Sequence, residues 1–499
     1  MTYIRRQPEK STLYQAVSSN QRSFQARLEY EGRVLPRFVH KEFDAYLKCG
    51  RLKHGFVRIY CRACKHTRLV AFSCKKRGFC PSCTGRRMAQ TAIHQTENIL
   101  PDTPIRQWVF TLPPDLRIYL AYHPEAMSDT LDIFMESVRF FYRKSCLPQT
   151  DHPPTSYDPE ALRDYTSLYP NDIGAITSIQ RFNDALSLYP HFHTLVSDGL
   201  FVTSDPPFDP WNRSAQEQVN DVTFHQTREP TNTDLLDILI HVRYRLIKRF
   251  IYKGYLRPTP DFNDEGKPIF ALYWGSEDPN EEMSQLLRCY AASTQLKHAF
   301  GPQAGERLSI DEDGEPSFKF KGPLCVDLHG FGLHAATYIE RGNRERVEQM
   351  CRYINRPPIS QDRLIPLEDG RFYYAFKRVW ANGARGIFFD GADLMERLAA
   401  LIPTPYKNIT RYHGAFAPRS RLRKAVTKRA QREFSRWVGA MRHKRRVYWL
   451  LWSTLMKHVF KEDVLECPRC TSSMQLIAVI DQPNVIHRLL RYADTKEPP

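Results

Sequence analysis

The sequence lacks any stretch that is long and apolar enough to cross a membrane. Its longest apolar run, at residues 447–456, is far shorter than the roughly 20 residues that a spanning helix requires. Residues 1–17 also lack the apolar core and cleavage pattern of a secretory signal. We therefore expect a cytoplasmic protein with no membrane partner.

Acidic residues are in deficit. The 499-residue chain has 72 Lys and Arg against 55 Asp and Glu, for a formal net charge of +17. The excess is concentrated, because residues 419–446 hold twelve Lys or Arg and one Glu, with Phe434 and Trp437 among them. Such a stretch can follow a phosphate backbone and stack on bases. A solvated basic helix is the alternative, but the net charge favours nucleic acid as the partner.

Apolar spacing predicts a mixed fold. Residues 131–141 have helical spacing, and so do residues 343–356. We expect strands at residues 107–112, 173–182, 186–197 and 200–202, a turn at 183–184, a tight hairpin at 198–199, and a strand pair within 324–339. The order of these elements predicts an α+β fold with an antiparallel sheet.

Twelve cysteines in a reducing compartment indicate metal binding rather than disulfides. Cys61-x2-Cys64-x15-Cys80-x2-Cys83 has the spacing of two zinc knuckles, because each Cys-x2-Cys places two thiolates on one side of a tight turn. The sequence therefore predicts one zinc ribbon with these four ligands. A redox dithiol is the alternative. Cys74 could replace one of the four ligands, and Cys49 is a weaker substitute.

Positive charge surrounds the predicted zinc ribbon and suits phosphate contact. The candidate DNA-binding residues there are Lys75, Lys76, Arg77, Arg86 and Arg87. A second motif, Cys467-x2-Cys470, is only half a site, since no second knuckle follows it. A complete site there would need His487, His458 or distant cysteines.

Two histidines bracket one apolar residue in the segment Pro190-His191-Phe192-His193. In a strand, His191 and His193 project to one face while Phe192 projects to the other. Such a pair can hold a divalent cation that polarises a phosphodiester. A structural or surface histidine pair is the alternative interpretation.

Tyr353 is the candidate nucleophile. It follows Gln349 by four residues on the predicted helix, on a face shared with Arg346, and Arg352 and Arg356 lie within one turn. A tyrosine there could attack phosphorus while guanidinium groups stabilise the transition state. The alternative is an amphipathic tyrosine at the edge of a core.

Together these motifs resemble the rolling-circle transposases of the insertion sequence 91 family, which are HUH endonucleases (His, hydrophobic, His). The resemblance is carried by VAFSCKKRGFCPSC at 70–83, PHFHTLV at 190–196 with Asp198-Gly199, LHA at 333–335, CRYINRPP at 351–358, HGAFAP at 413–418, and the CPRC at 467–470. It therefore extends over nearly the whole chain.

The resemblance implies that a tyrosine cleaves single-stranded DNA, forms a 5′-phosphotyrosine link and rejoins it to a 3′-hydroxyl. It makes His191 and His193 ligands of Mg²⁺ or Mn²⁺ and Tyr353 the nucleophile, with zinc as a structural metal. Members with two tyrosines place them four residues apart, and here Gln349 occupies the upstream position. This implies a single-tyrosine enzyme. Strand exchange would then need the tyrosine of a second protomer, which makes a homodimer a possible partner, or the sequential use of one tyrosine. Gln349 is also a candidate third metal ligand, with His334 and His329 as rivals.

The expected organisation has three parts: a zinc-binding, DNA-binding domain at 1–100, a catalytic domain with loop insertions at 101–418, and a basic region with Cys-x2-Cys at 419–499. The expected function is a DNA transposase acting on single-stranded element ends and targets in the bacterial cytoplasm, associated with the nucleoid when bound to DNA. A plasmid replication initiator or relaxase would use the same chemistry. A non-catalytic zinc-ribbon DNA-binding protein and a metallohydrolase are rival candidates from different functional classes.

Overall fold

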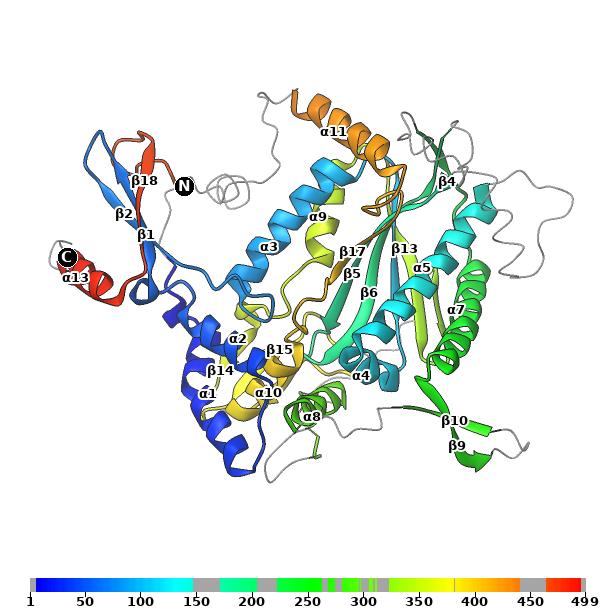
Figure 1. Ribbon diagram of the computed structural model, residues 1–499, viewed down its shortest axis with the longest axis horizontal. Helices are drawn as coiled ribbons and strands as arrows, with labels where there is room; N and C mark the ends of the chain where they lie inside the picture. Colours follow the sequence, from blue (N-terminus) through cyan, green and yellow to red (C-terminus); the bar gives the residue numbers. More distant parts are fainter. Residues whose placement is uncertain are drawn as a thin grey trace, which may run out of the picture.

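A six-stranded antiparallel sheet forms the centre of the computed structural model (Figure 1). Its strand order is β12-β13-β3-β6-β5-β17. The strands are β3 (Ile105–Thr111), β5 (Gly174–Phe182), β6 (Leu188–Ser197), β12 (Cys325–Leu328), β13 (Phe331–Ile339) and β17 (Thr410–Gly414). The predicted His-x-His strand is therefore β6, in the interior of the sheet, and the expected α+β class with an antiparallel sheet is confirmed.

The structure describes residues 6–146, 171–203, 222–262, 268–273, 281–295, 297, 305–307, 310–311, 323–380, 382–439 and 464–494. Within these residues, no helix has the length and apolar character of a membrane span.

Helices cover both faces of the sheet, because the strands carry apolar side chains on both sides. Figure 1 shows α5 (Pro124–Cys146) and α7 (Asn232–Tyr252) on one side, and α3 (Pro81–His94) and α9 (Arg344–Ile354) on the other. Phe192 faces the α5 side and packs on Phe134 with ring centroids 6.3 Å apart. Because side chains alternate along a strand, His191 and His193 lie on the opposite face of the sheet from Phe192, which is the face that α9 covers.

The N-terminal unit consists of α1 (Thr12–Tyr30), α2 (Arg37–Lys48) and the hairpin of β1 (Phe56–Cys61) and β2 (Thr67–Ala71), followed by α3. β18 (Met474–Ile480), from the other end of the chain, pairs with β1 to give the order β18-β1-β2. In Figure 1 the blue β1 and β2 and the red β18 lie side by side. The expected boundary between the second and third parts of the chain, at residue 419, therefore places β18 in a different part from β1 and β2, although the three strands share one sheet.

Smaller elements surround this frame. One sheet has the order β11-β16-β15-β14, a second has β4-β7-β8, and a third pairs β10 with β9. Their bounds are β4 (Asn171–Asp172), β7 (Gly199–Val202), β8 (Thr223–Gln226), β9 (Leu256–Phe262), β10 (Pro268–Leu272), β11 (Ile310–Asp311), β14 (Leu364–Pro366), β15 (Phe372–Ala375) and β16 (Gly386–Phe389). The other helices are α4 (Pro114–Tyr122), α8 (Glu281–Gln295), α10 (Gly391–Leu401), α11 (Arg423–Gly439) and α13 (Pro483–Asp494).

The predicted tight hairpin at residues 198–199 is wrong. β7 pairs with β4 and β8 rather than folding back on β6. Asp198 is buried, where it accepts a 2.7 Å hydrogen bond from the Tyr142 hydroxyl and forms a 3.1 Å ion pair with Arg106. At the tip of a hairpin the Asp198 carboxylate would be exposed to water. Here Tyr142 and Arg106 bind it in the interior, so Asp198-Gly199 marks the point where the chain passes from one sheet to another.

Candidate active site and cysteine clusters

The two histidines of β6 converge on one point. His191 Nε2 and His193 Nε2 lie 3.0 Å apart, and both side chains are more than nine-tenths buried. Strand alternation places them on the same face, as the sequence predicts. His191 Nδ1 donates to the Tyr189 carbonyl at 2.7 Å, which leaves its Nε2 lone pair free for a ligand.

Burial keeps this pair uncharged. Burial lowers the pKa of His191 to about 4, and the nearby cations Arg356 and Arg117 act in the same direction. The pKa of His193 lies well below its ordinary value because of burial and then because of the neighbouring His191 and Arg356. Both imidazoles are therefore neutral at pH 7, which is the form that binds metal ions.

The spacing of the pair fits an octahedral cation. Two adjacent ligands at about 2.1 Å from such an ion lie about 3.0 Å apart, and the two Nε2 atoms have this separation. Gln107 lies 2.9 Å from His193 Nδ1. Its amide can donate to Nδ1 or, rotated by half a turn, accept from Nδ1–H, so it can orient either tautomer of His193.

Tyr353 lies beside the histidine pair. Its ring centroid is 5.5 Å from that of His193, with the two planes nearly perpendicular, and 37% of the residue is exposed. The guanidinium carbon of Arg356 lies 4.7 Å from the Tyr353 ring centroid, and Lys377 Nζ lies 5.8 Å from it. The hydroxyl-bearing side chain therefore combines solvent access with two nearby cations.

Gln180 holds the tyrosine helix over the sheet. This residue is paired with His191 in the β5–β6 register. Its side-chain amide donates to the carbonyls of Ile354 at 2.9 Å and Tyr353 at 3.3 Å. These carbonyls belong to the last turn of α9, which lacks intrahelical donors. One strand residue thus fixes the end of the helix that carries Tyr353.

A cavity of about 520 Å³ opens between β3, β13 and α9. It is lined by Gln107, Val109, His193, His334, Thr337, Arg346, Gln349, Met350, Tyr353, Lys377 and Arg378. The structure thus brings Gln349 and its neighbour Arg346 to the same cavity as Tyr353. His334 joins them because it pairs with Val109, which pairs with His193 across three adjacent strands. His329 lies outside this lining, in the turn before β13.

Arg352 lines neither this cavity nor the one described next. It forms a 2.6 Å ion pair with Glu348 on α9. Residues that the sequence patterns did not reveal are Gln107, Lys377 and Arg378. Lys377 and Arg378 are a basic pair just after β15, and only the tertiary fold reveals that this loop reaches α9.

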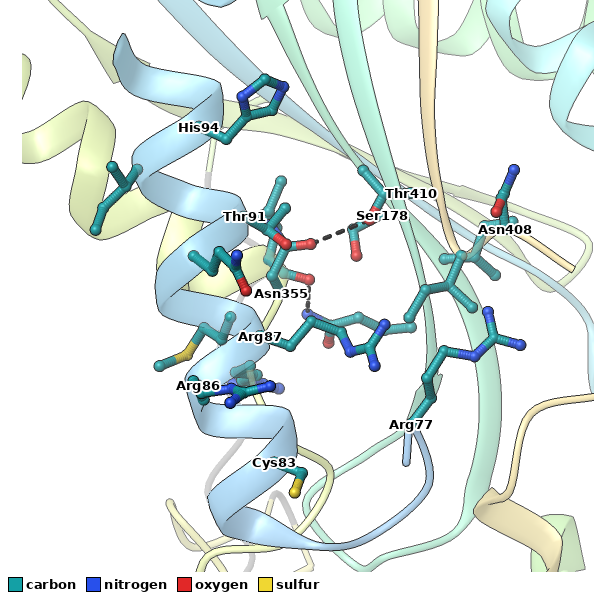
Figure 2. A pocket seen from close by; sticks show the side chains of 18 of the residues that line it. Arg77, Cys83, Arg86, Arg87, Thr91, His94, Ser178, Asn355, Asn408 and Thr410 are labelled. Carbon is teal, nitrogen blue, oxygen red and sulfur yellow. Dashed lines mark hydrogen bonds between the residues drawn. The ribbon is translucent and has the colours of Figure 1, made fainter. Parts of the chain in front are cut away.

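A second cavity, of about 630 Å³, lies between α3 and the strands β5 and β17. Figure 2 shows Arg77 and Arg87 on two sides of it, with Arg86 on the same helix as Arg87. Its basic lining residues are Lys75, Arg77, Arg86, Arg87 and Arg356. Glu97 is the acidic residue of the lining, and burial raises its pKa to about 7. Lys76 is not among the lining residues.

Eight of the eleven cysteines whose side chains the structure describes form two groups of four. Cys49, Cys74, Cys80 and Cys83 make one group, and Cys61, Cys64, Cys467 and Cys470 make the other. Within each group the sulfur atoms all lie within 4.8 Å of one another. The predicted single set of Cys61, Cys64, Cys80 and Cys83 is therefore divided between the two groups.

The physical reason for this correction is the pairing of β1 with β18. Cys61 ends β1 and is paired with Met474, so Cys61 and Cys64 meet Cys467 and Cys470 rather than Cys80 and Cys83, which lie at the start of α3. The knuckle at Cys80 is completed by Cys49 and Cys74, with sulfur distances of 3.4 to 3.6 Å. The sequence offered Cys74 and, more weakly, Cys49 as substitute ligands, but only the fold shows that both join Cys80 and Cys83, since Cys49 follows α2 and belongs to no Cys-x2-Cys motif.

Two family models match the chain. Residues 17–112 match a model described as "Transposase zinc-binding domain", of the insertion sequence 91 type, and residues 174–424 match one described as "Putative transposase". The second match spans half of the chain. No curated protein and no solved structure matches.

A zinc-binding domain followed by a transposase domain defines the class of protein as a transposase, with DNA as its partner. The chain belongs to this transposase family and has the architecture of the insertion sequence 91 family.

Proposed function

We propose that this transposase nicks and rejoins single-stranded DNA through a 5′-phosphotyrosine bond on Tyr353 during rolling-circle transposition. The observation that carries the proposal is the position of the Tyr353 ring, 5.5 Å from a buried, neutral histidine pair and at the wall of an open cavity. A structural tyrosine at a core edge would need neither this pair nor the surrounding cations.

The covalent step exchanges one phosphodiester for another. Tyr353 Oη bonds to phosphorus, the bond from phosphorus to the 3′-oxygen breaks, and the 5′-phosphate stays on the tyrosine. The tyrosine hydroxyl loses one proton and the departing 3′-oxygen gains one. A free 3′-hydroxyl then reverses the exchange, so no nucleotide hydrolysis is needed.

His191 and His193 are the residues that would hold Mg²⁺ or Mn²⁺ through their Nε2 atoms. When bound, the cation would supply charge stabilisation to the phosphate oxygens. Gln349 and His334 line the same cavity and are the candidates for a further ligand. Gln107 orients the His193 ring, and the Tyr189 carbonyl orients the His191 ring.

Arg356, Lys377 and Arg378 are proposed to bind the scissile phosphate and its neighbours. Arg356 lines the second cavity and lies over the Tyr353 ring, so it connects the two spaces. We propose that the DNA strand passes from Tyr353 into the basic cavity beneath α3. Arg77, Arg86 and Arg87 would neutralise its phosphates there, as guanidinium groups do without reading sequence.

Gln349 makes this a single-tyrosine site. It occupies the helix position four residues before Tyr353, and Arg346 donates a 3.3 Å hydrogen bond to its side-chain oxygen. Strand exchange therefore needs the tyrosine of a second protomer or two successive reactions at Tyr353.

The test is nicking of labelled single-stranded oligonucleotides that carry the ends of the protein's own element, in the presence of Mg²⁺ or Mn²⁺. Tyr353→Phe should abolish nicking and leave binding unchanged. Tyr338→Phe is the matched control, because Tyr338 has nearly the same exposure, 38%, on the neighbouring β13. Equal nicking by wild type and Tyr353→Phe would refute the assignment.

The cation requirement is tested in the same assay. His193→Ala and chelation by EDTA should each abolish nicking, whereas exposed His329→Ala should retain it. If the protein binds the oligonucleotides but does not nick them with either Mg²⁺ or Mn²⁺, the result would favour a non-catalytic DNA-binding protein.

A further inference from the structure

Two Cys-x2-Cys turns from opposite ends of the chain face each other at one end of the β18-β1-β2 sheet. The first contains Cys61 and Cys64, at the end of β1, and the second contains Cys467 and Cys470, just before β18. Cys61 is paired directly with Met474 in the β1–β18 register. Only the first turn lies within a segment matched by a family model.

The four sulfur atoms have the spacing of a tetrahedral metal site. Cys61 Sγ lies 3.5 Å from Cys470 Sγ, and Cys64 Sγ lies 3.4 Å from Cys467 Sγ. Four thiolates at about 2.3 Å from Zn²⁺ would lie about 3.8 Å from one another. The observed spacing therefore accommodates Zn²⁺ with small adjustments.

The two turns also have the same backbone conformation. The Cys61 N–H donates to the His66 carbonyl at 2.9 Å and the Lys65 N–H to the Cys61 carbonyl at 3.0 Å. In the second turn, Cys467 and Thr471 make the corresponding bonds to the carbonyls of Ser472 and Cys467, each at 2.9 Å.

The residue after each second cysteine is in the left-handed region, with φ of 64° at Lys65 and 56° at Thr471. Non-glycine residues adopt this conformation at a cost, so its repetition indicates a constraint that both turns share. Ligation of one metal ion by both turns is such a constraint.

The apolar cluster beneath the turns is small. Its buried members are Ile59, Cys61, Val70, Cys467 and Met474, and a second small cluster of Phe56, Ile480 and Ile486 lies at the other end of the same strands. Small units with few buried side chains commonly gain stability from a metal, disulfides or a partner. A structural zinc ion supplies folding free energy directly.

We propose that Cys61, Cys64, Cys467 and Cys470 bind a second Zn²⁺ that joins the two ends of the chain in one zinc ribbon. The first zinc then belongs to Cys49, Cys74, Cys80 and Cys83, within the matched zinc-binding domain. The C-terminal residues 464–494 become part of the N-terminal unit. This inference is independent of the proposed phosphotyrosine chemistry.

The test is the zinc content of the purified full-length protein, measured by mass spectrometry of the metal together with protein concentration. Wild type should contain two zinc ions per chain, and Cys467→Ser with Cys470→Ser should contain one. Cys74→Ser with Cys80→Ser should also contain one. Cys325→Ser is the control, because Cys325 lies in neither group, and it should retain two.

A second measurement uses the unaltered protein, since a variant could fail to fold. Alkylation of the native protein should label Cys325 and spare Cys467 and Cys470, and prior removal of zinc by a chelator should make both reactive. One zinc ion per wild-type chain, or disulfides linking Cys61 to Cys470 and Cys64 to Cys467, would overturn the proposal. Chelator-independent labelling of Cys467 and Cys470 would overturn it as well.

Discussion

Burial sets the protonation state of the two candidate ligands, His191 and His193. A histidine in water is half protonated near pH 6.5, whereas the pKa of His191 is lowered to about 4. The Nε2 lone pairs therefore remain available for a cation well below neutral pH. The fold achieves this by placing both side chains beneath α9, next to Arg356, which adds a positive charge nearby.

This predicts the pH dependence of cation binding. Because the folded pKa of His191 is below the unfolded value, binding of Mn²⁺ should stay constant as pH falls from 7 to about 5 and should fail only as pH approaches about 4. The same shift predicts that stability decreases with falling pH between about 6.5 and about 4. Calorimetric titration with Mn²⁺ checks the binding, and a midpoint near pH 6.5 would contradict the buried pair.

Arg356 and Arg352 give a matched test on one helix and the turn that follows it. Arg356 lies over the Tyr353 ring, whereas Arg352 is paired with Glu348. Arg356→Gln should slow nicking by roughly 100- to 1,000-fold, because a preorganised charge at the reacting phosphate is lost. Arg352→Gln should change the rate by less than about threefold. Single-turnover nicking rates measure both, and equal effects would remove Arg356 from the site.

At the scale of elements, the site depends on how α9 is fixed to the sheet. The apolar stripe of Val347, Met350, Cys351 and Ile354 attaches one face of α9 to the sheet, and all four side chains are buried. This stripe leaves Tyr353 and Gln349 on the exposed side. Gln180 then fixes the end of the helix through two carbonyls.

Gln180→Leu should therefore loosen the tyrosine helix while the sheet stays folded. Loss of its hydrogen bonds to α9 should cost about 1–2 kcal/mol of unfolding free energy, and the nicking rate should fall further than binding does. Denaturant unfolding and nicking rates check these two effects. A control is Gln226→Leu, since Gln226 is exposed on β8 and donates to the Tyr338 hydroxyl, away from α9. Unchanged nicking in Gln180→Leu would show that α9 is held by its apolar face alone.

Local patterns predicted the elements that carry the site. The alternation around Phe192 and the helical spacing before Tyr353 were sufficient to identify β6 and α9. Asp198-Gly199 misled the prediction because the same dipeptide serves a hairpin or a change of sheet. The choice is made by Arg106 and Tyr142, which lie 92 and 56 residues away in the chain and bind the buried Asp198.

At the scale of the whole molecule, the cysteines show why distant partners could not be predicted. Each Cys-x2-Cys knuckle is a local signal, but Cys61 and Cys470 are separated by 409 residues and meet through pairing of β1 with β18. Lys377 reaches Tyr353 in the same non-local way. Knuckle and helix geometry follow from short-range sequence, whereas the grouping of ligands and cations follows from the complete fold.

The net charge of +17 predicts a strong salt dependence of DNA binding. The logarithm of affinity for single strands should fall linearly with the logarithm of salt concentration, by about 0.7 per neutralised phosphate. Arg86→Ala with Arg87→Ala should therefore reduce the slope by roughly 1.4.

The control for this slope is Arg371→Ala, because Arg371 is paired with Asp369 in the connection between β14 and β15 and does not line the cavity beneath α3. Fluorescence anisotropy over a salt series measures the slopes. An unchanged slope in the double variant would exclude the cavity beneath α3 as part of the DNA path.

The most direct test of the central claim is to identify the covalent bond itself. Purified protein is incubated with Mg²⁺ and a single-stranded oligonucleotide from its element's end, denatured and digested, and the nucleotide-bearing peptide is sequenced by mass spectrometry. The account predicts a 5′-phosphate on Tyr353 and a released strand whose 3′-hydroxyl a polymerase can extend. A link to another residue, or a 3′-phosphate on the released strand, would contradict it.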